Sequence, residues 1–397
     1  MVLDQDFPPD IRVENEALSL IEAGFDVSLL SVGIEKLPAR ATHRGIHLFR
    51  RRLPKQVRNK MRGLAGTVSL FTLFLEREIR KVYREKPFDV LHMHDLHLFG
   101  GGIRAGRVLG IPVVGDLHEN YVDALQRYAW STRFPGKFVV SIPRWRRIEK
   151  RWVNAVDRVI TVVEEMKARN IELGVDPNRL CIVSNTIRRE EFDRFPVRAD
   201  IVTSVRSEFT VLYTGGIDLH RGLGSVVRAM PAVIARIPRA RLVVVGEGRT
   251  RVELQKLAAD LDIANSVILT GWQDQTLLKS YILGSHVCLV PHLKSTHTDA
   301  TIPHKLFHYM YLEKPVVVTD CLPLKRIAEE TQCGLVYSSG DSSALSEALL
   351  TLAADPDVAR RMGQNGHQAV LERYNWEATA RGMVEMYEQL RYQYGRS

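Results

Sequence analysis

The chain has 397 residues, of which 45% are hydrophobic and 25% charged, with a formal net charge of +9. This length suits two globular domains, and the composition excludes a disordered or fibrous protein. The four cysteines lie far apart without a C-x-x-C pair, which predicts reduced thiols and excludes a disulfide framework or a cysteine zinc site: Cys181, Cys288, Cys321 and Cys333.

The first residues and the longest uncharged stretch bear on the cellular location. The N-terminus carries Asp4, Asp6 and Asp10 where a signal peptide would have basic residues, so we expect no signal peptide. Residues 63–75 are uncharged but fewer than the about 20 apolar residues that span a bilayer. We therefore expect a cytoplasmic protein, with peripheral contact to the inner face of a membrane as an open alternative.

Almost all the excess positive charge lies in the first half, where residues 1–195 hold 33 Lys/Arg against 25 Asp/Glu. One basic cluster spans residues 44–62 and runs into the apolar stretch that ends at 75, and a second, at 144–152, contains two tryptophans. Basic amphipathic helices bind anionic lipid surfaces, and a solvated helix face is the alternative. Segments 44–75 and 144–152 are thus our candidate membrane contacts. Since no RNA- or DNA-binding motif accompanies them, we expect no nucleic-acid partner.

Short β-rich runs alternate with helical patterns, which predicts parallel sheets with crossover helices. After a very short strand at 1–3, the first half has such runs at 27–32, 89–93, 112–116 and 158–163. The second half has them at 210–215, 241–246, 266–271, 286–291, 315–319 and 334–337. Residues 185–207 are charged and aperiodic and are the expected linker. The predicted domains are 1–190 and 208–375, with a last helix at about 376–397 that packs back on one of them.

Histidines and acids follow two strands of the first half. His92 and His94 project to one face of their strand, and Asp95 and His97 come next. His118 and Glu119 follow the strand at 112–116. A triple-histidine zinc site is one interpretation of the first group, and an active site that needs no metal is the other.

Loops after strands of the second half are candidate phosphate sites, because ligands of parallel sheets bind beyond the carboxyl ends of strands. Gly215 and Gly216 let the backbone approach a phosphate, and Arg221 offers a guanidinium fork. Gly246 and Gly271 end the next two strands, where simple turns are the alternative. The sequence around Gly246 lacks the third glycine of an NAD fingerprint.

The loop at 299–310 runs into a helical pattern. The backbone N–H groups of Thr301 and Ile302 are expected at the helix start, where they would hold a diphosphate. His304 and His308 share a helix face, but no third metal ligand is nearby in sequence, so we predict no metal there.

The order of these motifs resembles the family-4 glycosyltransferases of GT-B fold over essentially the full length. The segments that carry the resemblance are FPPDIRVENEALSLIEAGFDVSLLS, FDVLHMHD, IPVVGDLHE, VLYTGGIDLHRGLGSVVRAM, ARLVVVGEG, VILTGW, PHKLFHYMYLEKPVVVTD and RMGQNGHQAVLERYNWE. The resemblance implies an α/β protein in which two Rossmann-like domains face each other across a cleft, the first binding the acceptor and the second a nucleotide-sugar. The implied reaction is a hexosyltransferase-type transfer, with retention, to a glycan or lipid-linked acceptor, as in bacterial envelope polysaccharide or glycolipid synthesis. No metal or other cofactor is implied.

The resemblance also implies residue roles. It places His118 beside the transferred sugar. The implied donor-binding residues are Gly215, Gly216, Arg221, Gly246, Gly271, Thr301, Ile302, Lys305 and His308. The acceptor-side residues are Asp10, His94, Asp95 and Glu119.

The chain departs from the family pattern at several positions: Arg12 and Val13 replace two glycines, Gly216 an arginine, Arg221 a lysine, and Ala300 and His308 the paired glutamates of the donor loop. We therefore predict that charge is redistributed, so that Arg12, Arg221 and Lys305 together neutralise the departing diphosphate. His118, Arg221 and Arg12 are the predicted catalytic residues. A nucleotide-sugar epimerase of the same fold and a non-catalytic partner subunit are the alternative functions.

Overall fold

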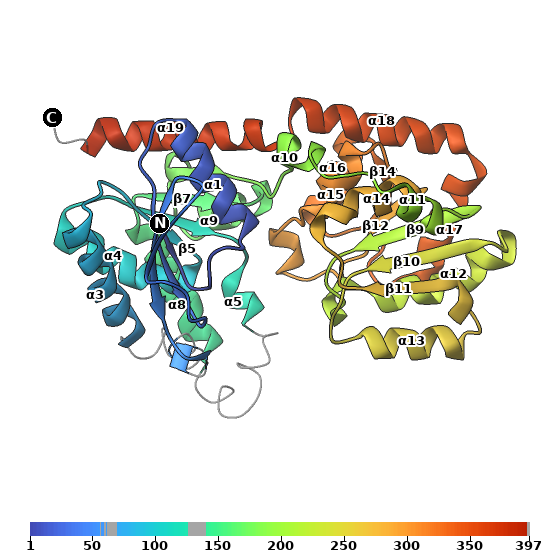
Figure 1. Cartoon of the computed structure of the whole chain (residues 1–397), viewed down its shortest axis with the longest axis horizontal. Helices are drawn as coiled ribbons and strands as arrows, with labels where there is room; N and C mark the ends of the chain where they lie inside the picture. The colour runs from blue at the N-terminus through green and yellow to red at the C-terminus, as the bar shows by residue number, and fades with distance from the viewer. Residues whose placement is uncertain (56, 59–60, 62–69, 126–139, 395–397) are drawn as a thin grey trace. The chain divides into compact units, whose positions relative to one another are not determined.

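The computed structural model describes residues 1–394 except 56, 59–60, 62–69 and 126–139. The chain divides into two compact units, one of Met1–Ser184 with Thr379–Ser397 and one of Asn185–Ala378. Each unit is a β-sheet flanked by helices (Figure 1). Among the residues described, no helix has both the length and the apolar composition needed to cross a bilayer.

The sheet of the first unit has the order β3-β4-β2-β1-β5-β6-β7-β8. All neighbouring strands are parallel except the β3–β4 hairpin. The strands are β1 (Val2–Leu3), β2 (Ser28–Gly33), β3 (Arg40–His43), β4 (Ile46–Arg52), β5 (Leu91–His94), β6 (Val113–Leu117), β7 (Arg158–Thr161) and β8 (Leu180–Ile182). The strand order reverses at β1 and β5, which is where α/β sheets open a crevice at the carboxyl ends of their strands.

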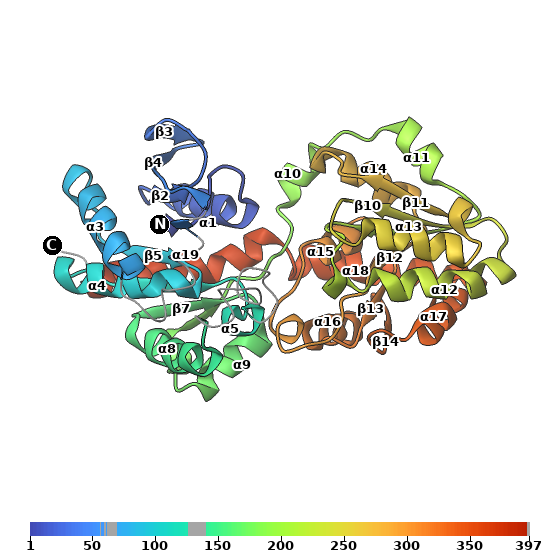
Figure 2. The same cartoon turned by 90° about the horizontal axis from the view of Figure 1, so that it is seen from below.

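The helices of this unit are α1 (Ile11–Glu22), α3 (Leu70–Glu85), α4 (Phe99–Leu109), α5 (Tyr121–Ala124), α8 (Ile142–Ala155), α9 (Glu164–Glu172) and most of α19 (Trp376–Tyr394). Helices α3 and α4 lie side by side (Figures 1 and 2) because α4 carries a run of glycines. A Cβ on Gly101 would lie 2.5 Å from Leu75, and one on Gly102 would lie 2.4 Å from Met93. Met93 therefore packs against α4, whereas the alternate residues of β5, His92 and His94, point to the opposite face.

The sheet of the second unit is fully parallel, with the order β11-β10-β9-β12-β13-β14. Its strands are β9 (Phe209–Thr214), β10 (Ala240–Val245), β11 (Val267–Gly271), β12 (Val287–Val290), β13 (Val316–Thr319) and β14 (Gly334–Tyr337). Because the order reverses between β9 and β12, the loops after Thr214 and Val290 open at the switch point of this sheet, where ligands of such folds bind.

The helices of the second unit are α10 (Arg189–Asp193), α11 (Ala199–Val205), α12 (Leu223–Arg236), α13 (Arg251–Asp260), α14 (Leu278–Gly284), α15 (Lys305–Tyr311), α16 (Leu322–Thr331), α17 (Ser342–Ala354) and α18 (Pro356–Glu372). The core is built from fully buried strand residues such as Val211, Val244 and Leu289, against which α12 packs with Val226 and Met230.

Every strand run predicted from the sequence is a strand in the structure. The β3–β4 hairpin was not predicted, because the charges of β4 hide its alternation. Strand β8, which has only three residues, was not predicted either. The expected linker at 185–207 is instead part of the second unit and contains α10 and α11.

The basic cluster at 44–62 is not one amphipathic helix, since β4 takes up its first part. Arg50 donates to the carbonyl of Phe7 at 3.0 Å, and Arg51 pairs with Glu78. Arg50 and Arg51 therefore already have partners within the first unit. Lys60, Arg62 and residues 63–69, on which the membrane prediction also rested, lie outside the described residues.

Candidate functional site

The first cluster of predicted site residues lies at the switch point of the second unit. After β9 the chain turns at Gly215, whose φ of 121° is unfavourable for a residue with a side chain. A Cβ at Gly215 would lie 2.7 Å from the Nζ atom of Lys305. Gly246 lies against the same turn, because a Cβ there would lie 2.0 Å from the carbonyl oxygen of Gly215. Gly271 in turn accepts a hydrogen bond from the Gly246 amide at 2.9 Å.

Lys305 is the most unusual group of this cluster. Its Nζ atom is buried and, in the part of the chain that the structure describes, has no hydrogen-bond partner. It lies 3.7 Å from the ring centroid of Tyr213, whose hydroxyl donates to the Gly216 carbonyl at 2.8 Å. Burial lowers the pKa of Lys305 well below its ordinary value, and Arg221 lowers it further. Among the residues that the structure describes, no anionic group hydrogen-bonds to this lysine.

Arg221 adds a second cation to this cluster. Its Nη1 donates to the Nε2 atom of buried His292 at 2.8 Å. Burial and the charges of Arg221 and Lys305 keep the pKa of His292 well below its ordinary value, so this ring is a neutral acceptor. Asp218, which begins the same turn, pairs with Arg249 at 2.8 Å. The cluster thus has an excess of positive charge.

The loop at 299–310 differs from its prediction. Thr301 is extended, with φ −150° and ψ 157°, and α15 begins only at Lys305. The residue before a proline avoids the helical region, so Pro303 delays the helix. The predicted helix start at Thr301 and Ile302 is therefore wrong, and Ile302 instead accepts a hydrogen bond from Asn185 at 3.0 Å through its carbonyl.

His308 stands one turn after Lys305 on α15. Its ring stacks on Phe192 with 4.8 Å between the ring centroids. Burial lowers the pKa of His308 to about 3, so the imidazole is neutral at physiological pH. A neutral ring against an aromatic partner differs from the carboxylate implied by the family pattern.

The second cluster lies in the first unit, around the carboxyl ends of β5 and β6. The centre of this cluster is Asp116, which is fully buried. Its Oδ1 accepts from the Nη2 atom of Arg12 at 2.9 Å. Its Oδ2 faces the Nε2 atom of His118 at 2.7 Å and the Nδ1 atom of His94 at 3.2 Å.

Arg12 is buried in this cluster, with only 5% of its surface exposed. Its Nη1 donates to the carbonyl of Val183 at 2.7 Å, and its Nη2 pairs with Glu16 at 3.0 Å as well as with Asp116. The prediction that Arg12 neutralises the diphosphate is therefore corrected. Arg12 is an internal counter-ion, because it lies on the inner face of α1.

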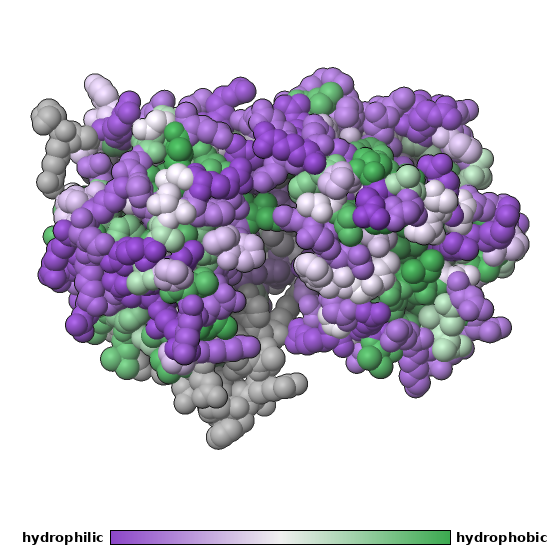
Figure 3. Space-filling model, in the orientation of Figure 1, coloured by the Kyte–Doolittle hydropathy of each residue, from purple (hydrophilic) through white to green (hydrophobic). Residues whose placement is uncertain are grey.

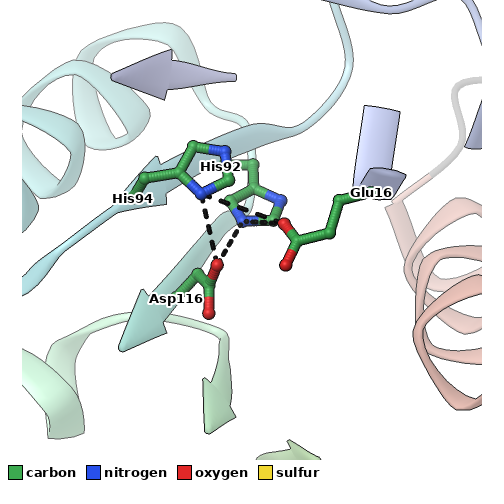
Figure 4. Close-up of side chains that lie close together, drawn as sticks. All are labelled: Glu16, His92, His94 and Asp116. Carbon is green, nitrogen blue, oxygen red and sulfur yellow. Dashed lines mark hydrogen bonds and ion pairs between the residues drawn. The ribbon is translucent and has the colours of Figure 1, made fainter. Parts of the chain in front are cut away.

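Four buried side chains of this cluster have the donor types that bind metal ions: Glu16, His92, His94 and Asp116 (Figure 4). One ligand atom from each lies within 4.8 Å of the others. His92 also contacts the hydroxyl of Tyr387, on α19, through its Nδ1 atom at 2.6 Å. Glu16, Asp116 and Tyr387 were not predicted as site residues, because nothing local in the sequence marks them.

The remaining predicted residues of this unit have different surroundings. Asp10 caps α1 by accepting from the Val13 amide at 3.0 Å. Asp95 follows β5 with a φ of 71°, an unusual value that is found preferentially at functional sites. Its Oδ1 lies 3.9 Å from the Nδ1 atom of His118. Glu119 is half-buried.

The histidines of this cluster differ in the direction in which their pKa values are shifted. Burial alone would lower the pKa of His118, but Asp116 and Asp95 outweigh it and raise the pKa to about 10. Burial holds the pKa of His94 well below its ordinary value, and neighbouring His92 lowers it further. Burial also raises the pKa of Glu16 to about 8, against the opposing effect of Arg12.

The melting temperature of the first unit is expected to fall as the pH rises from about 7 to about 10. Glu16 and His118 have folded pKa values above their ordinary values, so the folded protein keeps protons that the unfolded chain has released. This stability is complete below the unfolded pKa values and is lost as the pH rises through the folded ones. Scanning calorimetry at several pH values measures it. A melting temperature that rises over this interval would contradict the assignment, and His118→Asn should reduce the fall.

The basic segment 144–152 lies on α8. Trp145, Ile148 and Trp152 are buried in the unit, so the aromatic side chains are not available to a lipid interface as the sequence suggested. The exposed face carries only the cations: Arg144, Arg146, Arg147, Lys150 and Arg151. Hydrophilic residues cover most of each unit on the face shown in Figure 3.

A cavity of about 450 Å³ lies in the first unit at the opposite end of the strands. It is lined by the segments around Met1, Phe25 and Phe88 and by α19 residues such as Leu390. Of the candidate histidines of the first unit, His92 lines this cavity, together with Tyr387.

Both units match families of known proteins. Residues 9–186 match the glycosyl transferase 4-like domain, and residues 200–369 match the glycosyl transferases group 1 family. An uncharacterized glycosyltransferase of Methanocaldococcus jannaschii is 21% identical over 95% of this chain and 93% of its own length. A phosphatidyl-myo-inositol mannosyltransferase of Mycobacterium leprae is 23% identical over 80% of this chain and 78% of its own.

Solved structures show the same fold. Sucrose-phosphate synthase from Thermosynechococcus elongatus superposes with a TM-score of 0.77 at 19% identity, covering 99% of each chain. HepE of Anabaena, solved in complex with UDP-glucose, superposes with a TM-score of 0.69 at 14% identity and covers 98% of this chain and 99% of its own.

Proposed function

Because the chain belongs to the group 1 glycosyltransferases of GT-B fold and uses a nucleotide-sugar donor, we propose that the cationic cluster of its second unit binds the donor diphosphate. The observation that carries this proposal is the buried Nζ atom of Lys305, which points at the Gly215 turn without a hydrogen-bond partner among the described residues. Burying an unpaired charge is unfavourable, so a lysine kept in this position is expected to meet an anionic ligand. Arg221 supplies the second cation.

The chemistry follows from these charges. When the bond between sugar and diphosphate breaks, negative charge grows on the leaving phosphate. Fixed cations at Lys305 and Arg221 stabilise that charge more than they stabilise the intact donor. No metal ion is needed for this step, and we propose that the reaction is metal-independent. The first unit then provides the acceptor side, with His118 and Asp95 at the open end of its sheet.

We further propose that the transfer retains the anomeric configuration. Asp116 is buried and its carboxylate is occupied by Arg12, His94 and His118, so it is not available as a nucleophile. This disfavours a double displacement through Asp116, so in the proposed retaining route the acceptor attacks on the face that the diphosphate leaves, and the leaving phosphate takes the acceptor proton. The proton coupling at the anomeric carbon of the product, measured by NMR, distinguishes retention from inversion.

Calorimetry with nucleoside diphosphates tests the donor site. We expect one of UDP, GDP, ADP or TDP to bind with a stoichiometry of one, in the presence or absence of EDTA. The matching monophosphate should bind more weakly, because it lacks the second phosphate that Lys305 and Arg221 would contact. The donor assignment fails if none of the diphosphates binds, and the metal-free proposal fails if EDTA abolishes binding or transfer.

The acceptor is proposed to be a glycan or lipid-linked molecule at the inner face of a membrane, as in envelope polysaccharide or glycolipid synthesis. The support is the exposed cationic face of α8, which carries no exposed acid over residues 144–151. Cations near an anionic membrane surface contribute about 1 kcal/mol each.

Replacing Arg147 and Lys150 with glutamine is expected to lower binding to anionic vesicles at low salt by about 25-fold, since two residues at about 1 kcal/mol each act together. Vesicle co-sedimentation measures the effect. The matched control is Arg239→Gln with Lys256→Gln, which removes the same charge from exposed positions of the second unit. Equal loss in both variants would show a non-specific charge effect and contradict the assignment to α8.

A further inference from the structure

The carboxylate of Asp116 contacts the side chains of Arg12, His94 and His118. We propose that Asp116 is a positioning residue that holds His118 as an imidazolium, and that Arg12 and Glu16 fix Asp116 from α1. The role of His118 in sugar transfer rests on the proposed function, whereas its charge state does not. Asp116 itself is fully buried, so the proposal places it behind His118 and not in contact with the substrate.

The geometry around His118 favours a ring that is protonated on both nitrogens. Nε2 donates to the Oδ2 atom of Asp116 at 2.7 Å. Nδ1 lies 3.9 Å from the Oδ1 atom of Asp95 on the other side. A neutral imidazole with its proton on Nε2 would present a lone pair to the second carboxylate, whereas an imidazolium presents an N–H group to each. Only 19% of the His118 side chain is exposed, so water screens these charges weakly.

The other groups that face His118 are consistent with this charge state. From β5, the Nδ1 atom of His94 lies 3.1 Å from the Nε2 atom of His118, and both face the same oxygen of Asp116. Both nitrogens therefore act as donors to that oxygen, and His94 is neutral because burial lowers its pKa. From α1, Arg12 and Glu16 approach Asp116 from its far side. Arg12 opposes protonation of His118, but Asp116 and Asp95 outweigh it.

The network continues from Asp116 to the C-terminal helix. The rings of His92 and His94 stack with 4.2 Å between their centroids. The Nε2 atom of His92 lies 3.7 Å from Asp116, and its Nδ1 contacts the Tyr387 hydroxyl on α19. Residues of α1, β5, β6 and α19 thus hold one carboxylate in place. Such a shell is what keeps a functional side chain in a single orientation.

A metal ion at the same residues is the competing interpretation of this cluster (Figure 4). Arg12 and the imidazolium of His118 already provide two positive charges beside the carboxylate of Asp116 and the carboxyl group of Glu16, whose pKa burial raises to about 8. A divalent cation would add an excess of positive charge to a buried site, which is unfavourable. The charge balance therefore favours the positioning role.

Histidine NMR of the intact protein tests the charge state directly. In long-range ¹⁵N–¹H spectra, assigned with His118→Asn, the wild-type His118 ring is expected to stay doubly protonated above about pH 8, although an ordinary histidine loses its proton near pH 6.5. Asp116→Asn should lower the titration midpoint by at least about two pH units. Asp95→Asn, at a partly exposed position, should lower it by less. Glu149→Gln, which breaks a buried pair with Arg169 elsewhere in the unit, should not change it.

Kinetics separate positioning from a structural role. Asp116→Asn is expected to lower kcat by about 100-fold with little change in nucleotide affinity, because the donor diphosphate is bound by the second unit. The pH–rate profile of Asp95→Asn should lose activity at a lower pH than that of the wild type. Glu149→Gln should leave the profile unchanged.

Four results would overturn the proposal. They are a wild-type His118 that titrates near pH 6.5, an unchanged His118 titration in Asp116→Asn, a titration shift of equal size in Glu149→Gln, and a stoichiometric metal ion in the purified protein by mass spectrometry. If Asp116→Asn does not fold, the His118 titrations of the wild type and of Asp95→Asn still decide whether the proposal holds. Failure of nucleotide binding would contradict the proposed function and leave the NMR result standing, so the two failures are distinguishable.

Discussion

Lys305→Met is expected to weaken binding of the nucleoside diphosphate by roughly 10- to 100-fold, as hydrogen bonds to charged groups contribute about 1.5–3 kcal/mol. The same variant should melt at a higher temperature than the wild type when no ligand is present. Methionine keeps the length of the side chain over Tyr213 and removes a buried amino group that has no hydrogen-bond partner in the described structure. Opposite effects on binding and stability are typical of a residue kept for function.

Calorimetry measures the affinity of Lys305→Met, and a thermal scan measures its stability. The matched control is Lys314→Met, also in the second unit. The Nζ atom of Lys314 donates to the carbonyls of Leu283 and Ser285 at 3.1 and 2.7 Å, so its loss should lower stability and leave nucleotide affinity unchanged. An unchanged affinity in Lys305→Met would remove this lysine from the donor site.

Arg12→Ala is expected to lower the free energy of unfolding by about 3–5 kcal/mol, the usual effect of removing one partner of a buried ion pair. Its guanidinium is the counter-ion of the Asp116 carboxylate and also contacts the carboxyl group of Glu16, and both groups would remain buried without it. Denaturant unfolding measures the loss. Nucleotide affinity should not change, in contrast to what the sequence alone predicts for this residue.

The control for this variant is Arg40→Ala in the same unit. Arg40 pairs with Glu85 at the surface, where ion pairs contribute little, so stability should change only slightly. If Arg12→Ala were as stable as the wild type and bound nucleotide more weakly, Arg12 would contact the diphosphate after all and the internal role would be wrong.

The parallel strands were predictable because buried strands of α/β proteins are short apolar runs, as in β10 and β13. The β3–β4 hairpin escaped prediction because Arg50, Arg51 and Arg52 end a strand whose apolar residues are few. The motif predicts a helix that starts at Thr301, but α15 begins only at Lys305, because the residue before Pro303 avoids the helical region.

The two functional clusters differ in how far the sequence reveals them. Gly215 and Arg221 belong to the loop after β9 and Lys305 begins α15, and the family resemblance already pointed to all three. Asp116 and Arg12 are 104 positions apart, and His92 and Tyr387 are 295 apart. Contacts at such separations depend on the packing of α1 and α19 on the sheet, for which no local pattern exists.

A crystal structure of the protein with bound UDP, or with whichever diphosphate calorimetry selects, tests the donor site most directly. The phosphate oxygens should lie within hydrogen-bond distance of the Nζ atom of Lys305 and of the guanidinium of Arg221, next to the Gly215 turn. A diphosphate bound elsewhere, with neither cation in contact with it, would contradict the donor site proposed for this protein.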